Sequence, residues 1–453
     1  MDVRDLTKSA LTLPWAISMF GVQQLANLVG ARPSQRGLTG AASAFDSVSD
    51  AAAEQLDGWM KQTYKVGASV QGAAVDLMLL RAPEMNSSAL MRMAAELQSG
   101  PLFQFIVKYG MPPVGWLDSF LVPRRDSEAV RQEFANKLYI ISLVTQVHSA
   151  LGLDTQSNPS LPAIIERAAA METFPRLWAT EGVGNYWGDQ AWTRSGGIDP
   201  VGLLNDASTA ALPPWSLTML HAGIGMSFAK KVLAGLETTT PPEAVRSGIA
   251  RFATLCRHSS RPGYTGAALE SLGLATRTLY PNLVPVLDRE IPSVDRTLHG
   301  YFWHGAGRAM YFDPMNMLPS VNAPWRAIRR LETEAPHPLA YRNALSGLSW
   351  AITVVNMRHP SVMEAFLRHH ADVARANDAF GNGVASSLMM RYDTTRDDAR
   401  IAPFIHNRPS DQAVAAAWQS LITLPCAEAL RATYGELSQN GRLEELFHDA
   451  DHS

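Results

Sequence analysis

The sequence has few cysteines, little excess charge and no long apolar run, and each absence removes a class of protein. Cys256 and Cys426 form neither a disulfide framework nor the spacing of a zinc site, which indicates a reducing cytoplasm. A formal net charge of -3 leaves no basic footprint for nucleic acid. Because no uncharged apolar run of about 18 residues is present, no transmembrane segment is expected. The N-terminus also lacks the positive region of a signal peptide, so we expect a cytoplasmic protein.

Residues 1–82 have the pattern of amphipathic helices. Apolar residues recur at helical intervals over residues 6–29, where Trp15 and Phe20 strengthen one face. Such a helix could associate peripherally with a membrane, a granule surface or a partner helix, or it could dock on its own domain. Its polar face has few lysines and arginines, which favours docking. The phrase from Trp15 to Leu28 resembles the opening of phasin-like proteins, which coat polyester granules.

Residues 83–160 form a second region, which we interpret as linking helices. Prolines interrupt its first half, and a continuous helical pattern follows from Glu128 to Leu151, ending at Gly152 and Asp154.

Residues 161–453 form the third region, in which glycines recur inside helical and often aromatic phrases. The intervals between the phrases are roughly 34 to 48 residues, the range of two-helix repeats. The phrases contain Gly182, Gly223, Gly273, Gly305, Gly347 and Gly381. A glycine inside a helix costs roughly 1 kcal/mol relative to alanine, so these positions predict helix backbones in close contact. The last helical pattern should kink or split at Pro425, and the charged tail from Gly441 to Ser453 should fray.

No alternating pattern long enough for a sheet is present, so the predicted fold class is all-α. We expect an α/α repeat array, either a toroid or a curved solenoid, preceded by the N-terminal helical segment. The glycine-bearing helices would form an inner ring, with the more charged helices outside.

Two phrases of this region resemble motifs of an uncharacterised family encoded beside enediyne polyketide synthases. They run from His221 to Gly225 and from Gly305 to Phe312, and the phrase from Glu181 to Gly184 is similar to that family's acidic-glycine phrase. The resemblance spans about residues 174–390 and implies natural-product or lipid-like metabolism. In architecture the repeat also resembles the toroidal cyclases of lanthipeptides, but the adjacent Cys-His-Gly phrase of their zinc site is missing around Cys256.

His304, His221 and Glu181 are the candidate catalytic residues. Each lies at or just before a glycine pair, in matching places of different repeats, so their side chains would point into one space. An imidazole there could be a general acid or base, whereas the alternative is a buried histidine bonded to a neighbouring repeat. The three side chains could also form a 2-His-1-carboxylate metal site, but no local ligand motif supports it and no cofactor is predicted.

Arg308 lies one helical turn after His304 and on the same face. It could clamp a substrate carboxylate or phosphate, or it could form an ion pair with a residue such as Glu181. Tyr311, Tyr186 and Trp303 could line the same cavity, although aromatic residues at helical spacing more often belong to the core.

The sequence therefore favours a biosynthetic enzyme that acts on an apolar polyketide- or lipid-like small molecule by acid–base chemistry in a helical cavity. The alternative is a non-catalytic scaffold, or a protein that binds a hydrophobic ligand, with the N-terminal helices on a lipid surface or partner. Enzymatic activity is the slightly favoured of these.

Overall fold

The computed structural model describes residues 126–153, 159–312 and 323–449. The chain divides into two compact units, residues 1–110 and 111–453, and everything described below belongs to the second. The amphipathic helices expected in residues 1–82, and most of the linking region, lie outside the described residues.

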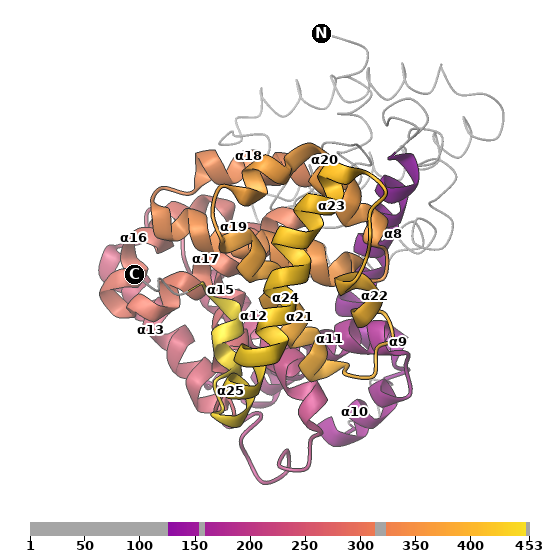
Figure 1. Ribbon diagram of the computed structural model, residues 1–453. Helices are drawn as coiled ribbons and strands as arrows, with labels where there is room; N and C mark the ends of the chain where they lie inside the picture. The colour runs from indigo at the N-terminus through magenta and orange to yellow at the C-terminus, as the bar shows by residue number, and fades with distance from the viewer. Residues whose placement is uncertain (1–125, 154–158, 313–322, 450–453) are drawn as a thin grey trace, which may run out of the picture. The chain divides into compact units, whose positions relative to one another are not determined.

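Every regular element in the described part of the chain is helical, which confirms the all-α prediction (Figure 1). The helix predicted from Glu128 to Leu151 is present as α8 (Ser127–Thr145) and α9 (Val147–Ala150). It stops at Gly152, whose φ of 58° is the left-handed value that glycine adopts readily after a helix. The short helix α10 (Leu161–Ala169) follows.

The helices that carry the glycine phrases form an inner series in which each packs on the next. They are α11 (Thr173–Arg194), α12 (Pro214–Leu233), α14 (Thr265–Leu269), α15 (Ser271–Leu279), α17 (Arg296–Tyr311), α19 (Pro338–Asn356) and α21 (Ala379–Thr394). The series returns on itself, because α21 also contacts α12, and Arg391 of α21 lies 5.9 Å from the centre of the Phe174 ring of α11. The inner helices thus form a closed arrangement rather than an open curve.

The glycines bring neighbouring inner helices into backbone contact. A Cβ placed on Gly184, Gly273 or Gly347 would lie within 3.0 Å of a carbonyl oxygen of a neighbouring inner helix, a distance that real Cβ atoms almost never show. The close approach expected from the sequence is therefore confirmed.

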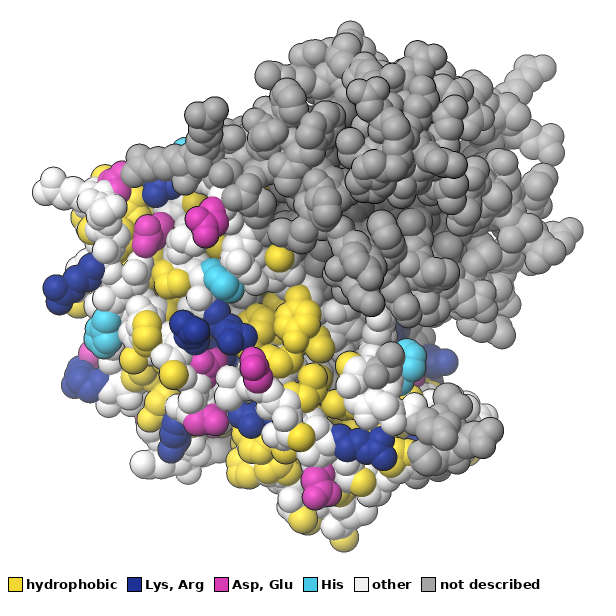
Figure 2. Space-filling model, turned by 90° about the vertical axis from the view of Figure 1, so that its right-hand side faces the viewer, with side chains coloured by type: hydrophobic (Ala, Val, Ile, Leu, Met, Phe, Trp, Pro, Cys, Tyr) yellow, Lys and Arg dark blue, Asp and Glu magenta, His cyan; other side chains and the backbone are white. Residues whose placement is uncertain are grey.

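A second set of helices lies between the inner ones in sequence and outside them in space. These are α13 (Pro242–Ser259), α16 (Val284–Val294), α18 (Ala323–Glu334) and α20 (Pro360–Arg375). In α13 the buried apolar side chains follow a single stripe that includes Val245, Ile249, Phe252 and Cys256. By contrast, α12 and α19 are buried on nearly every side, as inner helices must be. Figure 2 shows acidic, basic and hydrophobic side chains interspersed over the described part of one outer face.

A long helical stretch, Gln412–Gln439, follows the short α22 (Ile401–Ile405). Two π-helical turns, Gln419–Thr423 and Ala429–Thr433, divide this stretch into α23 (Gln412–Trp418), α24 (Leu424–Glu428) and α25 (Tyr434–Gln439). Pro425 lies at the start of α24, directly after the first π turn, and the helical stretch continues past it to Gln439, so the helix is not split at this proline and a kink there stays a prediction. By length and composition the stretch could cross a membrane, but one such helix is weak evidence.

The C-terminal segment, defined here as residues 441–449, does not fray as its charge suggested. This segment contains the 3-10 helix η6 (Leu443–Phe447). A second 3-10 helix, η2 (Pro281–Leu283), lies earlier in the chain, between α15 and α16. Leu443, Leu446 and Phe447 are buried, and η6 packs on α14, α17 and α21. Burial of these apolar side chains outweighs the solvation of the flanking charges.

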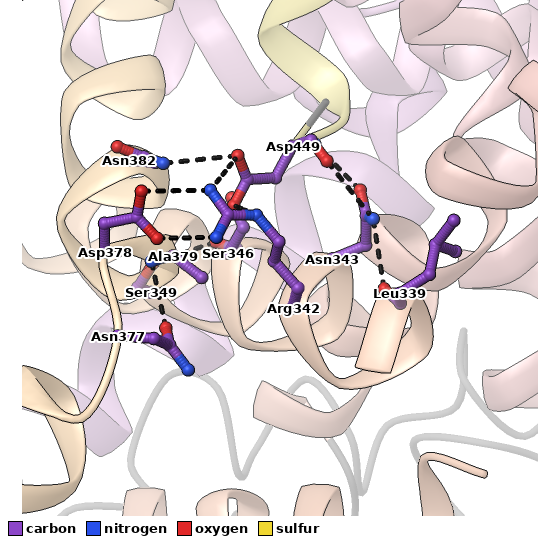
Figure 3. Close-up of polar contacts among 10 residues, drawn as sticks. All are labelled: Leu339, Arg342, Asn343, Ser346, Ser349, Asn377, Asp378, Ala379, Asn382 and Asp449. Atoms are coloured by element: carbon purple, nitrogen blue, oxygen red, sulfur yellow. Dashed lines mark hydrogen bonds and ion pairs between the residues drawn. The ribbon is translucent and has the colours of Figure 1, made fainter. Parts of the chain in front are cut away.

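Polar contacts fasten the end of this segment to α19 and α21 (Figure 3). Arg342 of α19 forms ion pairs with Asp449 and Asp378, with shortest N···O distances of 2.9 and 2.6 Å. Asn382 donates to Asp449 at 3.2 Å, and the backbone N–H of Asp449 donates to the side chain of Asn343 at 2.8 Å. The C-terminal segment is therefore an ordered cap on the inner helices.

Candidate functional site

Four charged or titratable side chains from the inner helices meet in the interior of the domain. Arg308 of α17 donates through Nη2 to Oε1 of Glu181 in α11 at 2.9 Å. Through Nη1 it donates to Oε2 of Glu270, the residue between α14 and α15, at 2.7 Å. The other oxygen of Glu270 lies 2.7 Å from Nδ1 of His304, which is one turn before Arg308 in α17. We call Glu181, Glu270, His304 and Arg308 the central cluster.

The central cluster is shielded from solvent. His304 and Glu270 are completely buried, and Arg308 is 3 % exposed. The Arg308 guanidinium lies 4.5 Å from the centre of the Trp350 ring, which adds a cation–π contact. Charges so deeply buried are costly unless each is paired, and here one cation is shared by two carboxyl groups.

The surroundings of the two carboxyl groups of the cluster shift their pKa values in opposite directions. Burial raises the pKa of Glu270, but the nearby Arg308 and His304 more than offset it and hold that pKa below the ordinary value. For Glu181, burial outweighs the attraction of Arg308 and the pKa is raised. Both carboxyl groups pair with the guanidinium, and Glu181 is the one that more readily retains a proton. Carboxyl pairs separated in this way supply an acid and a base in many active sites.

His304 has one occupied and one free ring nitrogen. An ionised carboxylate can only accept, so Nδ1 carries the proton that His304 donates to Glu270. The other nitrogen, Nε2, is buried and has no hydrogen-bond partner among the described residues. The Trp350 and Phe447 rings pack edge-to-face with the imidazole, and each ring centroid lies 6.4 Å from the imidazole centroid. Nε2 of His304 is therefore the one ring nitrogen of the cluster that is left for a further partner.

His221 lies outside the central cluster. Its Nδ1 donates to the carbonyl of Leu217 at 2.7 Å, and its Nε2 accepts the backbone N–H of Arg261 at 3.0 Å. Burial lowers its pKa to about 4, and the ring stacks on Tyr264. Because both nitrogens are occupied, the matching repeat positions of His221 and His304 do not give matching roles.

The predicted metal set of Glu181, His221 and His304 is not assembled, since the hydrogen bonds of His221 go elsewhere. A different group could hold a metal: ligand atoms of Asp288, His299 and His337 lie within 4.8 Å of one another. Cys256 and Cys426 are both buried and free.

The three predicted pocket residues besides Arg308 have other partners. The Tyr311 hydroxyl donates to Glu133 at 2.8 Å and accepts from Asn356 at 2.7 Å, so it links α17 to α8 and α19. The Trp303 indole N–H donates to Asp288 at 2.7 Å. Tyr186 is half-buried and packs on the core.

Of the central cluster, sequence reasoning identified Glu181, His304 and Arg308 and missed Glu270. The alternative proposed for Arg308, an ion pair with Glu181, is what the structure shows. A signal for Glu270 was present: it is the only charged residue between Arg261 and Arg277, and it comes just before the Gly273 phrase. Comparison with protein-family models, with curated proteins and with solved structures found no match.

Proposed function

We propose that this helical domain is an enzyme that acts on an apolar polyketide- or lipid-like molecule by acid–base chemistry. The observation that carries the proposal is the buried Nε2 of His304, which has no partner among the described residues while Glu270 holds the other ring nitrogen. A buried basic nitrogen without a partner is costly for stability alone, so a substrate proton is its natural partner.

The roles within the cluster follow from its geometry. His304 takes a proton from the substrate at Nε2, and Glu270 stabilises the imidazolium that forms. Glu181 returns a proton to the substrate, and Arg308 stabilises negative charge that develops between these two steps. One proton leaves the substrate and one enters it, so the chemistry suits an isomerisation or cyclisation and needs no co-reactant. Before the next turnover the imidazolium of His304 releases its proton to water and Glu181 takes one up.

A substrate must also be able to reach His304. Phe447 of η6 lies beside His304, so a substrate reaches Nε2 when the C-terminal segment moves away. Peripheral association through residues 6–29 and a cytoplasmic location stay predictions, because those residues lie outside the described part of the chain.

The first prediction tests the base. His304→Gln keeps a group that can donate to Glu270 but removes the basic nitrogen. We expect cells that produce the full-length protein to accumulate or lose a hydrophobic metabolite, and His304→Gln to reduce that change about a hundredfold or more. Untargeted mass spectrometry of cell extracts measures the effect.

The matched control is His258→Gln, because His258 is exposed and outside the cluster, and its metabolite profile should equal that of the original protein. Circular dichroism of the purified variants establishes that they are folded. A metabolite profile that the original protein does not change, or that folded His304→Gln changes equally, would instead favour the scaffold or ligand-binding function.

A further inference from the structure

A second group of polar side chains lies where α16, α17 and the beginning of α19 meet. Asp288 comes from α16, His299 from the first turn of α17, and His337 caps α19. Oδ1 of Asp288 lies 2.7 Å from Nε2 of His299 and 3.1 Å from Nε2 of His337. All three ligand atoms lie within 4.8 Å of one another.

The hydrogen bonds of this group are crowded. The Trp303 indole N–H also donates to Oδ1 of Asp288, so three nitrogens converge on one carboxylate oxygen. A carboxylate oxygen offers about two lone-pair directions, fewer than the donors that meet there. Replacing the two imidazole protons by one divalent cation removes this crowding, while the indole N–H stays to orient the carboxylate.

The ligand types specify the class of cation. Two imidazole nitrogens and one carboxylate oxygen suit zinc, cobalt, nickel or ferrous iron better than calcium or magnesium, which prefer oxygen ligands. The group is also accessible: the Asp288 and His337 side chains are 14 % and 33 % exposed. Three protein ligands leave coordination positions for water or another small molecule.

From these contacts we propose that Asp288, His299 and His337 bind one divalent transition-metal ion. The site is independent of the proposed acid–base function, because it shares no residue and no hydrogen bond described above with the central cluster. A metal ion there would replace the hydrogen bonds by which His299 and His337 already join α17 and α19 to Asp288 of α16.

His337 gives the sharpest variant, because it has two separable roles. Its Nδ1 accepts the backbone N–H of Ala340 at 3.1 Å, which caps α19, while its Nε2 points to Asp288. Metal binding at Nε2 requires Nδ1 to give up this cap bond in exchange for the stronger coordination bond. A serine at this position can cap the helix but cannot supply the imidazole ligand.

The experiment titrates Co²⁺ into the full-length protein after its metals have been removed with a chelator. We expect one ion per chain, read from visible absorption, with Zn²⁺ competing for it. His337→Ser and Asp288→Asn should each weaken binding at least about tenfold, whereas His406→Ser, at an exposed position, should leave it unchanged.

Thermal unfolding supplies an independent readout. Zn²⁺ should raise the unfolding temperature of the original protein, because it binds only the folded chain, and should not do so for His337→Ser. Absence of one-to-one binding, or equal affinity in folded His337→Ser and the original protein, would overturn the proposal. Since Asp288 lies in a separate element, Asp288→Asn decides the question if His337→Ser does not fold.

Discussion

Glu181 and Glu270 share the Arg308 guanidinium, yet their pKa values move in opposite directions. Both side chains are buried, but only Glu270 has a second positive or polar neighbour, the His304 imidazole. The added contact with His304 helps to hold the pKa of Glu270 below its ordinary value, whereas burial dominates at Glu181 and raises its pKa. At His221, burial and the nearby Arg261 charge lower the pKa and favour the neutral ring, and they outweigh the hydrogen bond to Leu217, which favours the charged one.

The third prediction concerns the pH dependence of stability at His221. The folded protein holds the pKa of His221 at about 4, whereas the ordinary value is 6.5. The unfolded chain therefore binds the proton more strongly, so this neutral imidazole contributes stability above pH 6.5 that is lost as the pH falls toward 4. Over that window the loss should be about 3 kcal/mol.

Chemical denaturation of the original protein and of His221→Gln between pH 7 and pH 4.5 measures this contribution. The variant should be less stable at pH 7 and should show a shallower loss of unfolding free energy on acidification. Parallel curves for the two proteins would contradict the prediction.

At the residue scale, three residues of the central cluster could be predicted from the sequence, whereas Glu270 was missed. His304 and Arg308 were recognised because local spacing places them on one helix face. Glu270 and the Asp288, His299 and His337 group come from elements distant in sequence. Only the path of the chain brings these side chains together, and spacing does not specify that path.

The inner helices are specified by small residues at their lines of contact. Gly305 and Gly307 of α17 lie against Glu270 and Ala344 on its two neighbours, and Gly347 of α19 lies against His304 of α17. Backbone contact of this kind leaves no space for a methyl group. The cost of glycine in these helices is offset by the close packing that it permits.

The fourth prediction compares two helical glycines. In Gly347→Ala the new Cβ would meet the backbone of His304, which cannot move aside, so we expect a destabilisation of about 2 kcal/mol or more. In Gly435→Ala nothing lies within 4 Å, and the helix should gain about 0.5–1 kcal/mol. Denaturant unfolding measures both; equal effects of the two substitutions would count against the packing argument.

At the element scale the sequence was most informative where the signal was local. Glycine inside helical patterns predicted the close helix contacts that the structure confirms. The π turns around Pro425 were not predicted, because they depend on how this helix packs rather than on the proline itself.

The domain as a whole is completed by the C-terminal segment. Residues 441–449 contact inner helices that are far apart in the chain, and Asp449 joins Arg342 and Asn382 across α19 and α21 (Figure 3). The charge of this segment suggested fraying, but Leu443, Leu446 and Phe447 recur at helical spacing and are buried. The apolar spacing, rather than the overall charge, was the correct signal.

The fifth prediction concerns this cap. Asp449→Ala removes the ion pair with Arg342 and the bond from Asn382, so backbone amides of residues 443–448 should exchange with solvent at least about tenfold faster. Amides in the middle of α19 should be unaffected. Hydrogen exchange read by mass spectrometry measures both regions.

The control is Glu428→Ala, which breaks the exposed ion pair with Arg431 and should leave all these rates unchanged. Unchanged exchange in Asp449→Ala, or an equal increase in α19, would show that the contacts of Asp449 do not hold the segment.

The glycine contacts also limit how far the inner helices can move relative to one another. Helices whose backbones touch at Gly184, Gly273 and Gly347 cannot slide or roll past one another without a clash, so the wall that they form is stiff. For the proposed enzyme, we therefore expect residues 441–449, rather than the inner helices, to be the part that moves when a substrate enters.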